Sequence, residues 1–152
     1  MVNPGRLLLA LLLVGSPVSA ALAQLAPAEE RIAAIIDSRS EAAGVLLART
    51  VDVSSATENH EGVRAVAEIY AAELKTLGFE TRWVDQADVG RAGHLVAERH
   101  GTRGKRILLI GHLDTVLQGE RFRRDGARAY GSGIADMKGG NLVALEALRA
   151  LH

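Results

Sequence analysis

The sequence predicts an α/β protein in which helices cover a central sheet. Three observations predict this class. A helical apolar period runs through residues 61–77, an alternating strand pattern covers 79–85, and an apolar run without alternation occupies 106–111. A strand that is apolar on both faces belongs in the middle of a covered sheet. The order helix, strand, strand, buried strand, helix is typical of α/β folds.

Two helices are expected in the first half of the chain. Residues 28–52 carry apolar side chains at helical spacing, and the polar stretch 38–41 could divide them into two helices, with Ser40 capping the second. Residues 61–77 give the cleanest amphipathic period of the chain. Gly78 follows directly and supplies a left-handed C-terminal cap.

Strands are expected after these helices. Residues 79–85 alternate as a half-buried strand does, and 94–99 form a second strand. The run 106–111 is the predicted buried strand, and two short strand-like pieces follow around 121–123 and 127–130. Residues 141–152 are again helical, and no Gly, Asn or Pro closes this last helix. We therefore expect the chain to be the N-terminal part of a larger domain.

The first 23 residues have the composition of a signal peptide. Arg6 provides a positive start, residues 7–14 are apolar, and small residues around Ala23 form a cleavage site. We expect residues 1–23 to be removed, residues 24–152 to belong to the folded protein, and the product to be periplasmic or secreted. The alternative is an uncleaved membrane anchor, but small and polar residues interrupt the apolar run before it reaches spanning length.

Charge and cysteine content exclude several classes of protein. The chain has 18 Lys or Arg against 18 Asp or Glu, so it has no nucleic-acid footprint. It has no cysteine, so disulfides do not stabilise it. Any transition metal must therefore be bound by histidine and carboxylate side chains.

The first candidate site residues are His112 and Asp114, which directly follow the predicted buried strand. Ligand crevices of open α/β sheets lie at such strand ends. A histidine there can bind a metal through one ring nitrogen while a carboxylate fixes the other nitrogen. The alternative is a hydrogen-bonded structural histidine without a ligand.

The second candidate is Asp136, which follows Gly131 and Gly133 and precedes the helix at 141–152. The glycines allow backbone turns that other residues resist. A carboxylate on such a loop can bridge two cations, but it can also simply cap the helix. The glycines do not form a dinucleotide fingerprint, because the third glycine and a preceding buried strand are missing. Ser132 has no base at a triad-like position, so serine hydrolysis has no support.

The two motifs together resemble a known family. "LLIGHLDTV" (108–116) followed by "YGSGIADMKGGNLVALEAL" (130–148) resembles the paired motifs of the M20 zinc metallopeptidases, which include glutamate carboxypeptidases, aminoacylases and succinyl-diaminopimelate desuccinylases. The stretch 54–81 resembles the first helix–strand unit of that family. The resemblance implies a three-layer, zinc-exopeptidase-type catalytic domain with helices on a mixed, mostly parallel sheet.

The resemblance also implies roles for individual residues. His112 matches a ligand of one zinc, and Asp136 matches the carboxylate that bridges two zinc ions. Asp114 matches the catalytic aspartate that orients the histidine. The peptide bond between Asp136 and Met137 is often cis in this family. The general base of the family is a glutamate of a Glu-Glu pair, expected beyond residue 152 together with the remaining ligands and the lid domain.

The implied function is an exported two-zinc hydrolase that cleaves an amide bond next to a free carboxylate, as a carboxypeptidase does. Its substrate would be a small peptide or an N-acyl amino acid, with no nucleic acid and no stable membrane anchor involved. The intact enzyme could dimerise through the lid domain, and the 152-residue chain by itself would be inactive. The alternatives are an aminoacylase, desuccinylase or dipeptidase of the same family, and a metal-free homologue that acts as a binding module.

Overall fold

The computed structural model describes residues 25–152, and the predicted signal peptide lies outside these residues. The described part is an α/β fold of three helices and two small hairpins. The helices are α1 (Pro27–Val51), α2 (His60–Thr76) and α3 (Gly139–Ala150). The strands are β1 (Glu80–Gln86), β2 (Arg91–Glu98), β3 (Arg123–Asp125) and β4 (Arg128–Tyr130), with short helical turns η1 (Ala87–Val89) and η2 (Ile134–Lys138).

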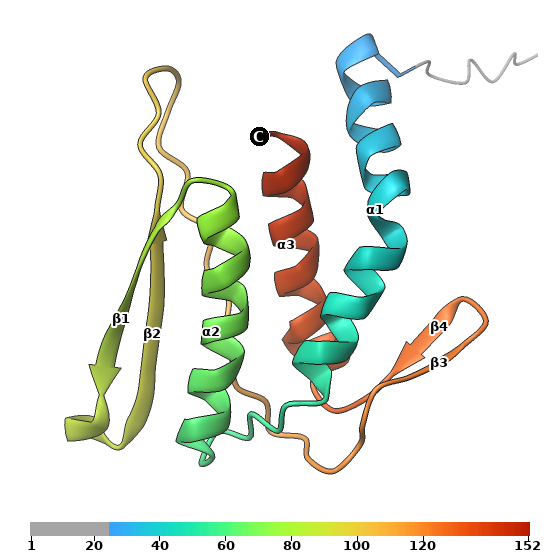
Figure 1. The fold of residues 1–152 in the computed structure, drawn as a ribbon. Coiled ribbons are helices and arrows are strands. Elements are labelled where there is room, and N and C mark those ends of the chain that lie inside the picture. Colours follow the sequence, from blue (N-terminus) through green and yellow to red (C-terminus); the bar gives the residue numbers. More distant parts are fainter. Residues whose placement is uncertain (1–24) are drawn as a thin grey trace, which may run out of the picture.

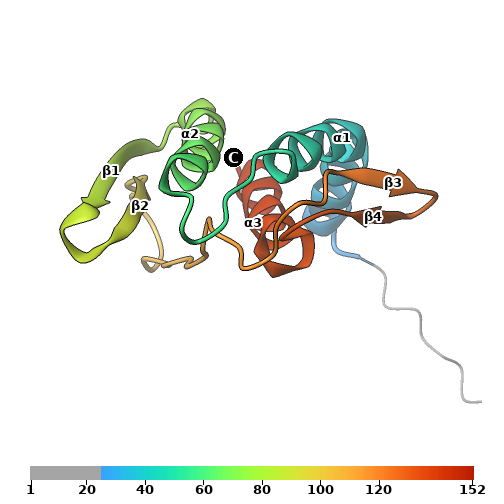
Figure 2. The same cartoon turned by 90° about the horizontal axis from the view of Figure 1, so that it is seen from below.

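The elements lie in a row. The β1–β2 hairpin packs on one side of α2, α3 lies between α2 and α1, and the β3–β4 hairpin projects beyond α1 (Figures 1 and 2). None of the helices within residues 25–152 is both long and apolar enough to cross a bilayer.

The first helix is continuous, so the expected break at residues 38–41 is wrong. Helix α1 runs unbroken for 25 residues, and Ser40 lies inside it rather than at a cap. The hydroxyl of Ser38 donates a hydrogen bond of 2.8 Å to the Ile35 carbonyl, one turn back. A serine that bonds to its own helix in this way does not need to end it.

The core forms where the amphipathic faces of the helices meet. Helix α2 begins at a true cap, because the Asn59 side chain accepts a hydrogen bond of 3.1 Å from the Gly62 amide. Gly78 ends it with a φ of 77°, as the sequence predicted. The buried cluster draws on all three helices and on the turn after α2. Its members are Leu46, Val66, Ile69, Tyr70, Leu77 and Leu145.

The β1–β2 hairpin confirms the two strands predicted after α2. The strands pair antiparallel, with Trp83 opposite Leu95. Along β1 the side chains of Thr81 and Trp83 are half-buried while those of Glu80 and Arg82 are exposed, which is the alternation predicted for one covered face. The short strands β3 and β4 also form an antiparallel hairpin, close to their predicted positions.

The prediction of a buried central strand at residues 106–111 is wrong for the described chain. This segment is in no strand, and Ile107 and Ile110 are 83% and 82% exposed. The paired strands of residues 25–152 form two separate antiparallel hairpins, so the expected mostly parallel sheet is not formed there. The physical reason is that a strand needs neighbours for its backbone hydrogen bonds, and neither hairpin pairs with this segment. The only parallel pairing within residues 25–152 is an isolated bridge between Ala56 and Thr115.

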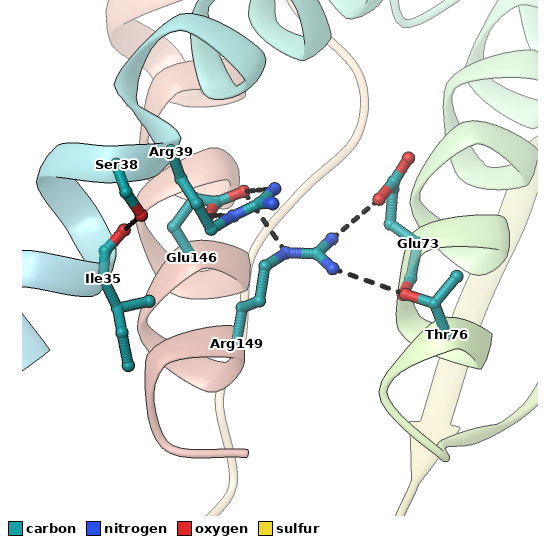
Figure 3. A network of polar contacts seen from close by, with 7 residues as sticks. All are labelled: Ile35, Ser38, Arg39, Glu73, Thr76, Glu146 and Arg149. Carbon is teal, nitrogen blue, oxygen red and sulfur yellow. Dashed lines mark hydrogen bonds and ion pairs between the residues drawn. The ribbon is translucent and has the colours of Figure 1, made fainter.

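A network of charged side chains joins the three helices. Arg39 of α1 binds Glu146 of α3 through two hydrogen bonds of 2.6 and 3.0 Å. Arg149 of α3 reaches Glu73 of α2 at 2.7 Å and the Thr76 hydroxyl at 3.4 Å (Figure 3). These contacts fix α3 between its two neighbours, and α3 begins directly after the second sequence motif.

Candidate metal centre

The structure brings His112 and Asp136 together from two separate segments. His112 lies in the loop after residues 106–111, and Asp136 lies in η2. The imidazole Nε2 of His112 is 2.9 Å from Asp136 Oδ1. The Asp136 side chain is 78% exposed and that of His112 is 43% exposed, so both groups are open to an incoming ligand.

Asp114 lies on the other side of the imidazole ring. The Nδ1 atom of His112 is 2.9 Å from the backbone carbonyl of Asp114 and 3.4 Å from its carboxylate oxygen Oδ1. The closer partner is thus the carbonyl, and the carboxylate adds its charge from slightly further away. Both contacts favour a proton on Nδ1, which leaves Nε2 as the nitrogen that faces Asp136.

The protonation of His112 follows from these contacts. Partial burial by itself lowers the pKa of the imidazole, but the hydrogen bond to Asp136 and the contacts with Asp114 outweigh this effect. The net result is a pKa raised above the usual 6.5. Because both ring nitrogens face oxygen acceptors, the imidazolium form is stabilised when no cation is bound.

Two residues that the sequence analysis did not single out hold the His112 backbone. The Asn141 side chain, in the first turn of α3, donates a hydrogen bond of 2.7 Å to the His112 carbonyl. The His112 amide in turn lies 3.4 Å from the Met137 sulfur. Both residues belong to the segment that carries Asp136, so this segment supports both sides of the His112–Asp136 pair. The sequence did contain a signal for these two residues, because both lie in the stretch "DMKGGN" that begins with Asp136.

A third residue that the sequence did not single out is Thr57. Its hydroxyl donates a hydrogen bond of 2.7 Å to Asp114 Oδ2, across 57 residues of sequence. The loop is held in place by backbone bonds on either side of the Ala56–Thr115 bridge. The Thr57 amide donates to the Thr115 carbonyl at 3.2 Å, and the Thr115 amide donates to the Ser55 carbonyl at 2.9 Å.

The alternative in which Asp136 caps the last helix is wrong. The N-cap of α3 is Lys138 and receives no side-chain cap bond, whereas the Asp136 carboxylate contacts His112. Gly131 and Gly133 have φ values of 148° and 74°, as expected for the turns that lead to Asp136. The peptide bond between Asp136 and Met137 is cis, as the resemblance implied.

Lys138 anchors this loop to the core. Its side chain is only 1% exposed, and its ammonium donates a hydrogen bond of 2.8 Å to the Val53 carbonyl. Its own carbonyl accepts a hydrogen bond of 3.0 Å from the buried Tyr70 hydroxyl. Burial lowers the pKa of the Lys138 ammonium and raises the pKa of the Tyr70 hydroxyl. The loop that carries Asp136 is therefore fixed to α2 and to the segment that follows α1.

The donors present fit a zinc ion in part. Within residues 25–152, no group of three or more His, Asp or Glu side chains is arranged to hold a metal ion. Zinc in proteins normally takes about four ligands, of which imidazole nitrogen and carboxylate oxygen are common types. His112 Nε2 and Asp136 Oδ1 are of these types and already face one another. They can supply two ligands, and the metal role of each stays a prediction.

Comparison with known proteins gives matches to one family. Residues 108–152 match Peptidase family M20/M25/M40. The chain is 39% identical over 110 residues to carboxypeptidase G2 of Pseudomonas sp. (strain RS-16). This alignment covers 69% of this chain and 26% of that protein. The chain is also 36% identical over 104 residues to a putative succinyl-diaminopimelate desuccinylase of Mycobacterium tuberculosis (strain ATCC 25618 / H37Rv). That alignment covers 66% of this chain and 27% of that protein.

The chain thus spans about a quarter of the length of these curated relatives. The matched family region contains His112, Asp114 and Asp136, the three residues whose side chains meet in the structure. Sequence similarity and site geometry agree on the same segment. The chain belongs to the M20 family of metallopeptidases.

Proposed function

We propose that the complete gene product is an exported two-zinc hydrolase that cleaves an amide bond next to a free carboxylate. One observation carries this proposal: His112 Nε2 and Asp136 Oδ1 face each other at 2.9 Å within the matched family region. A histidine and a carboxylate that converge at an exposed position are suited to bind a divalent cation.

Each of the three residues has a distinct task in the proposed site. His112 would hold one zinc ion through Nε2, and the Asp136 carboxylate would serve as the ligand shared by the two ions. Asp114 fixes the imidazole through the contacts at Nδ1 and raises its basicity. When bound, zinc polarises a carbonyl and lowers the pKa of a coordinated water.

The rigid surroundings of the loop support this assignment. Lys138 and Tyr70 fix the Asp136 segment to the core, and Asn141 fixes the His112 carbonyl to α3. Ligands that are held before the metal arrives lose less conformational entropy on binding.

The two kinds of relative suggest two substrate classes. Similarity to a carboxypeptidase supports a peptide with a free terminal carboxylate as the substrate. Similarity to a putative desuccinylase supports an N-acyl amino acid instead. The higher identity to the carboxypeptidase favours the first class. A homodimer and an extracytoplasmic location belong to the same proposal, the latter because of the leader-like residues 1–23.

The test is to purify the complete gene product and measure bound zinc by elemental analysis. Hydrolysis is then assayed with peptides ending in glutamate, with N-acetyl amino acids and with N-succinyl amino acids. We expect two zinc ions per chain and turnover of at least one substrate class. His112→Ala is the matched control, which should bind at least one zinc ion fewer per chain and lose most of its turnover. A protein without zinc and without turnover would be a binding module, contrary to the proposal.

Export has a separate test. The protein is expressed with its native leader, the extracytoplasmic fraction is collected, and the N-terminus of the mature chain is determined by mass spectrometry. Cleavage after Ala23 would give a protein that begins at Gln24. An uncleaved protein that still begins at Met1 and is found in the cytoplasm would contradict export.

A further inference from the structure

We infer that Thr57 is a positioning residue of the zinc site, although it lies 57 residues before Asp114 and outside both sequence motifs. It acts through Asp114 on His112. This inference rests on the proposed function, because it assumes that His112 binds zinc.

The two oxygens of the Asp114 carboxylate have different partners. Its Oδ2 atom accepts the Thr57 hydroxyl at 2.7 Å, and its Oδ1 atom lies 3.4 Å from His112 Nδ1. One oxygen is thus fixed by threonine while the other is directed at the imidazole. A hydroxyl that donates to an ionised carboxylate forms one of the stronger kinds of hydrogen bond.

Thr57 itself is held rigidly. Its amide donates to the Thr115 carbonyl, and the neighbouring residues Ser55 and Ala56 are fully or almost fully buried. The parallel bridge between Ala56 and Thr115 ties this loop to the segment that carries Asp114. The hydroxyl therefore comes from backbone that cannot shift without breaking the bridge.

Loss of the Thr57 hydroxyl would release the Asp114 carboxylate. Without the hydroxyl, Asp114 can rotate about its χ torsions and leave Nδ1 with the backbone carbonyl alone. The imidazole would then be oriented less strictly and would carry less negative charge beside it. Outer-shell partners of metal-binding histidines change metal affinity by about 10- to 100-fold when they are removed. Thr57 acts one contact further out, so we expect about the lower limit of that range.

The experiment compares Thr57→Val, which removes the hydroxyl at nearly constant shape, with Thr57→Ser, which keeps it. Thr81→Val in β1 is the matched control, because it makes the same substitution in the β1–β2 hairpin. Each variant of the complete gene product is stripped of metal. Its Kd for zinc is then measured by competition with a chelating dye, and its Tm is measured without metal.

The expected result is a zinc Kd about 10-fold higher for Thr57→Val, with the wild-type Kd in Thr57→Ser and Thr81→Val. The Tm of the metal-free Thr57→Val protein should stay close to that of the wild type. A wild-type Kd in Thr57→Val would overturn the inference while leaving the proposed function intact. A weaker Kd that is accompanied by a fall in Tm, and that serine does not restore, would show a purely structural role and also overturn it. A wild-type protein that binds no zinc would overturn both proposals.

Discussion

The Nε2 atom of His112 lies 2.9 Å from Asp136 Oδ1, and 24 residues of sequence separate the two. The contact joins the loop after an extended apolar segment to the turn before α3. The proposed metal site depends most directly on this contact.

His112→Ala removes the imidazole that faces Asp136. We expect the zinc content of the complete gene product to fall by at least one ion per chain, and turnover to fall by about 100-fold or more. Elemental analysis after dialysis measures the first effect, and steady-state kinetics measure the second. Unchanged zinc stoichiometry would show that His112 is not a ligand.

Asp114→Asn keeps the shape of the side chain and removes its charge. Zinc should still bind, because the His112 Nδ1 contact with the backbone carbonyl of Asp114 at 2.9 Å is unaffected, but its Kd should rise by at least the roughly 10-fold expected for Thr57→Val. Turnover should fall by about 10- to 100-fold, because the imidazole loses the neighbouring negative charge. The comparison of kcat with zinc content tests this, and wild-type kcat would exclude Asp114 from the mechanism.

Asn141→Ala removes the hydrogen bond of 2.7 Å to the His112 carbonyl while keeping a good helix former in α3. We expect zinc to bind several-fold more weakly, because the His112 loop is then no longer fixed to the helix that follows Asp136. Val143→Ala on the same helix is the control, since Val143 is 70% exposed. Equal zinc Kd values for the two variants would contradict a supporting role for Asn141.

Glu146→Gln tests the network that fixes α3. Glu146 is buried and binds Arg39, and this bond lowers the pKa of its carboxyl below the usual 4.5. A carboxyl with a lowered folded-state pKa stabilises the protein fully above its unfolded pKa, and this stability is lost as the pH falls through the folded pKa. We expect the variant to lose about 2 kcal/mol of unfolding free energy at pH 7.

The pH profile distinguishes this effect from general damage. In urea unfolding between pH 7 and 3, the loss of stability on acidification should be smaller in Glu146→Gln than in the wild type. Glu68→Gln is the control, because Glu68 pairs with Arg64 on the exposed face of α2 at 3.3 Å. Such surface pairs contribute about 0.5 kcal/mol or less. Parallel pH profiles for Glu146→Gln and the wild type would refute the role of the carboxylate.

The exposed apolar segment 106–111 predicts self-association of residues 25–152 when they are produced alone. Ile107 and Leu108 are 83% and 80% exposed, and the backbone here has no strand partner. Unpaired apolar edges of this kind associate with other chains. Ile107→Lys together with Leu108→Lys should lower the average mass measured by light scattering, whereas Val89→Lys in η1 should not. Equal masses for all three proteins would contradict this.

The sequence by itself determined the local elements of this protein. The apolar period of α2 and Gly78 act over a few residues, so the position of this helix could be predicted closely. The hairpin of β1 and β2 was also predictable, because its two strands are close neighbours in sequence and β1 alternates. The paired motifs gave His112, Asp114 and Asp136 as candidates, since they resemble those of a known family.

Only the tertiary structure decided which groups touch. The Thr57–Asp114 and Asn141–His112 bonds span 57 and 29 residues, and no local pattern records such pairings. The segment 106–111 also shows that local sequence does not determine tertiary contacts. Its composition predicts burial, but burial depends on strands and helices that pack against it, and residues 25–152 leave it exposed. Local periodicity specifies an element, whereas its neighbours are specified by packing and hydrogen bonding between segments far apart in the chain.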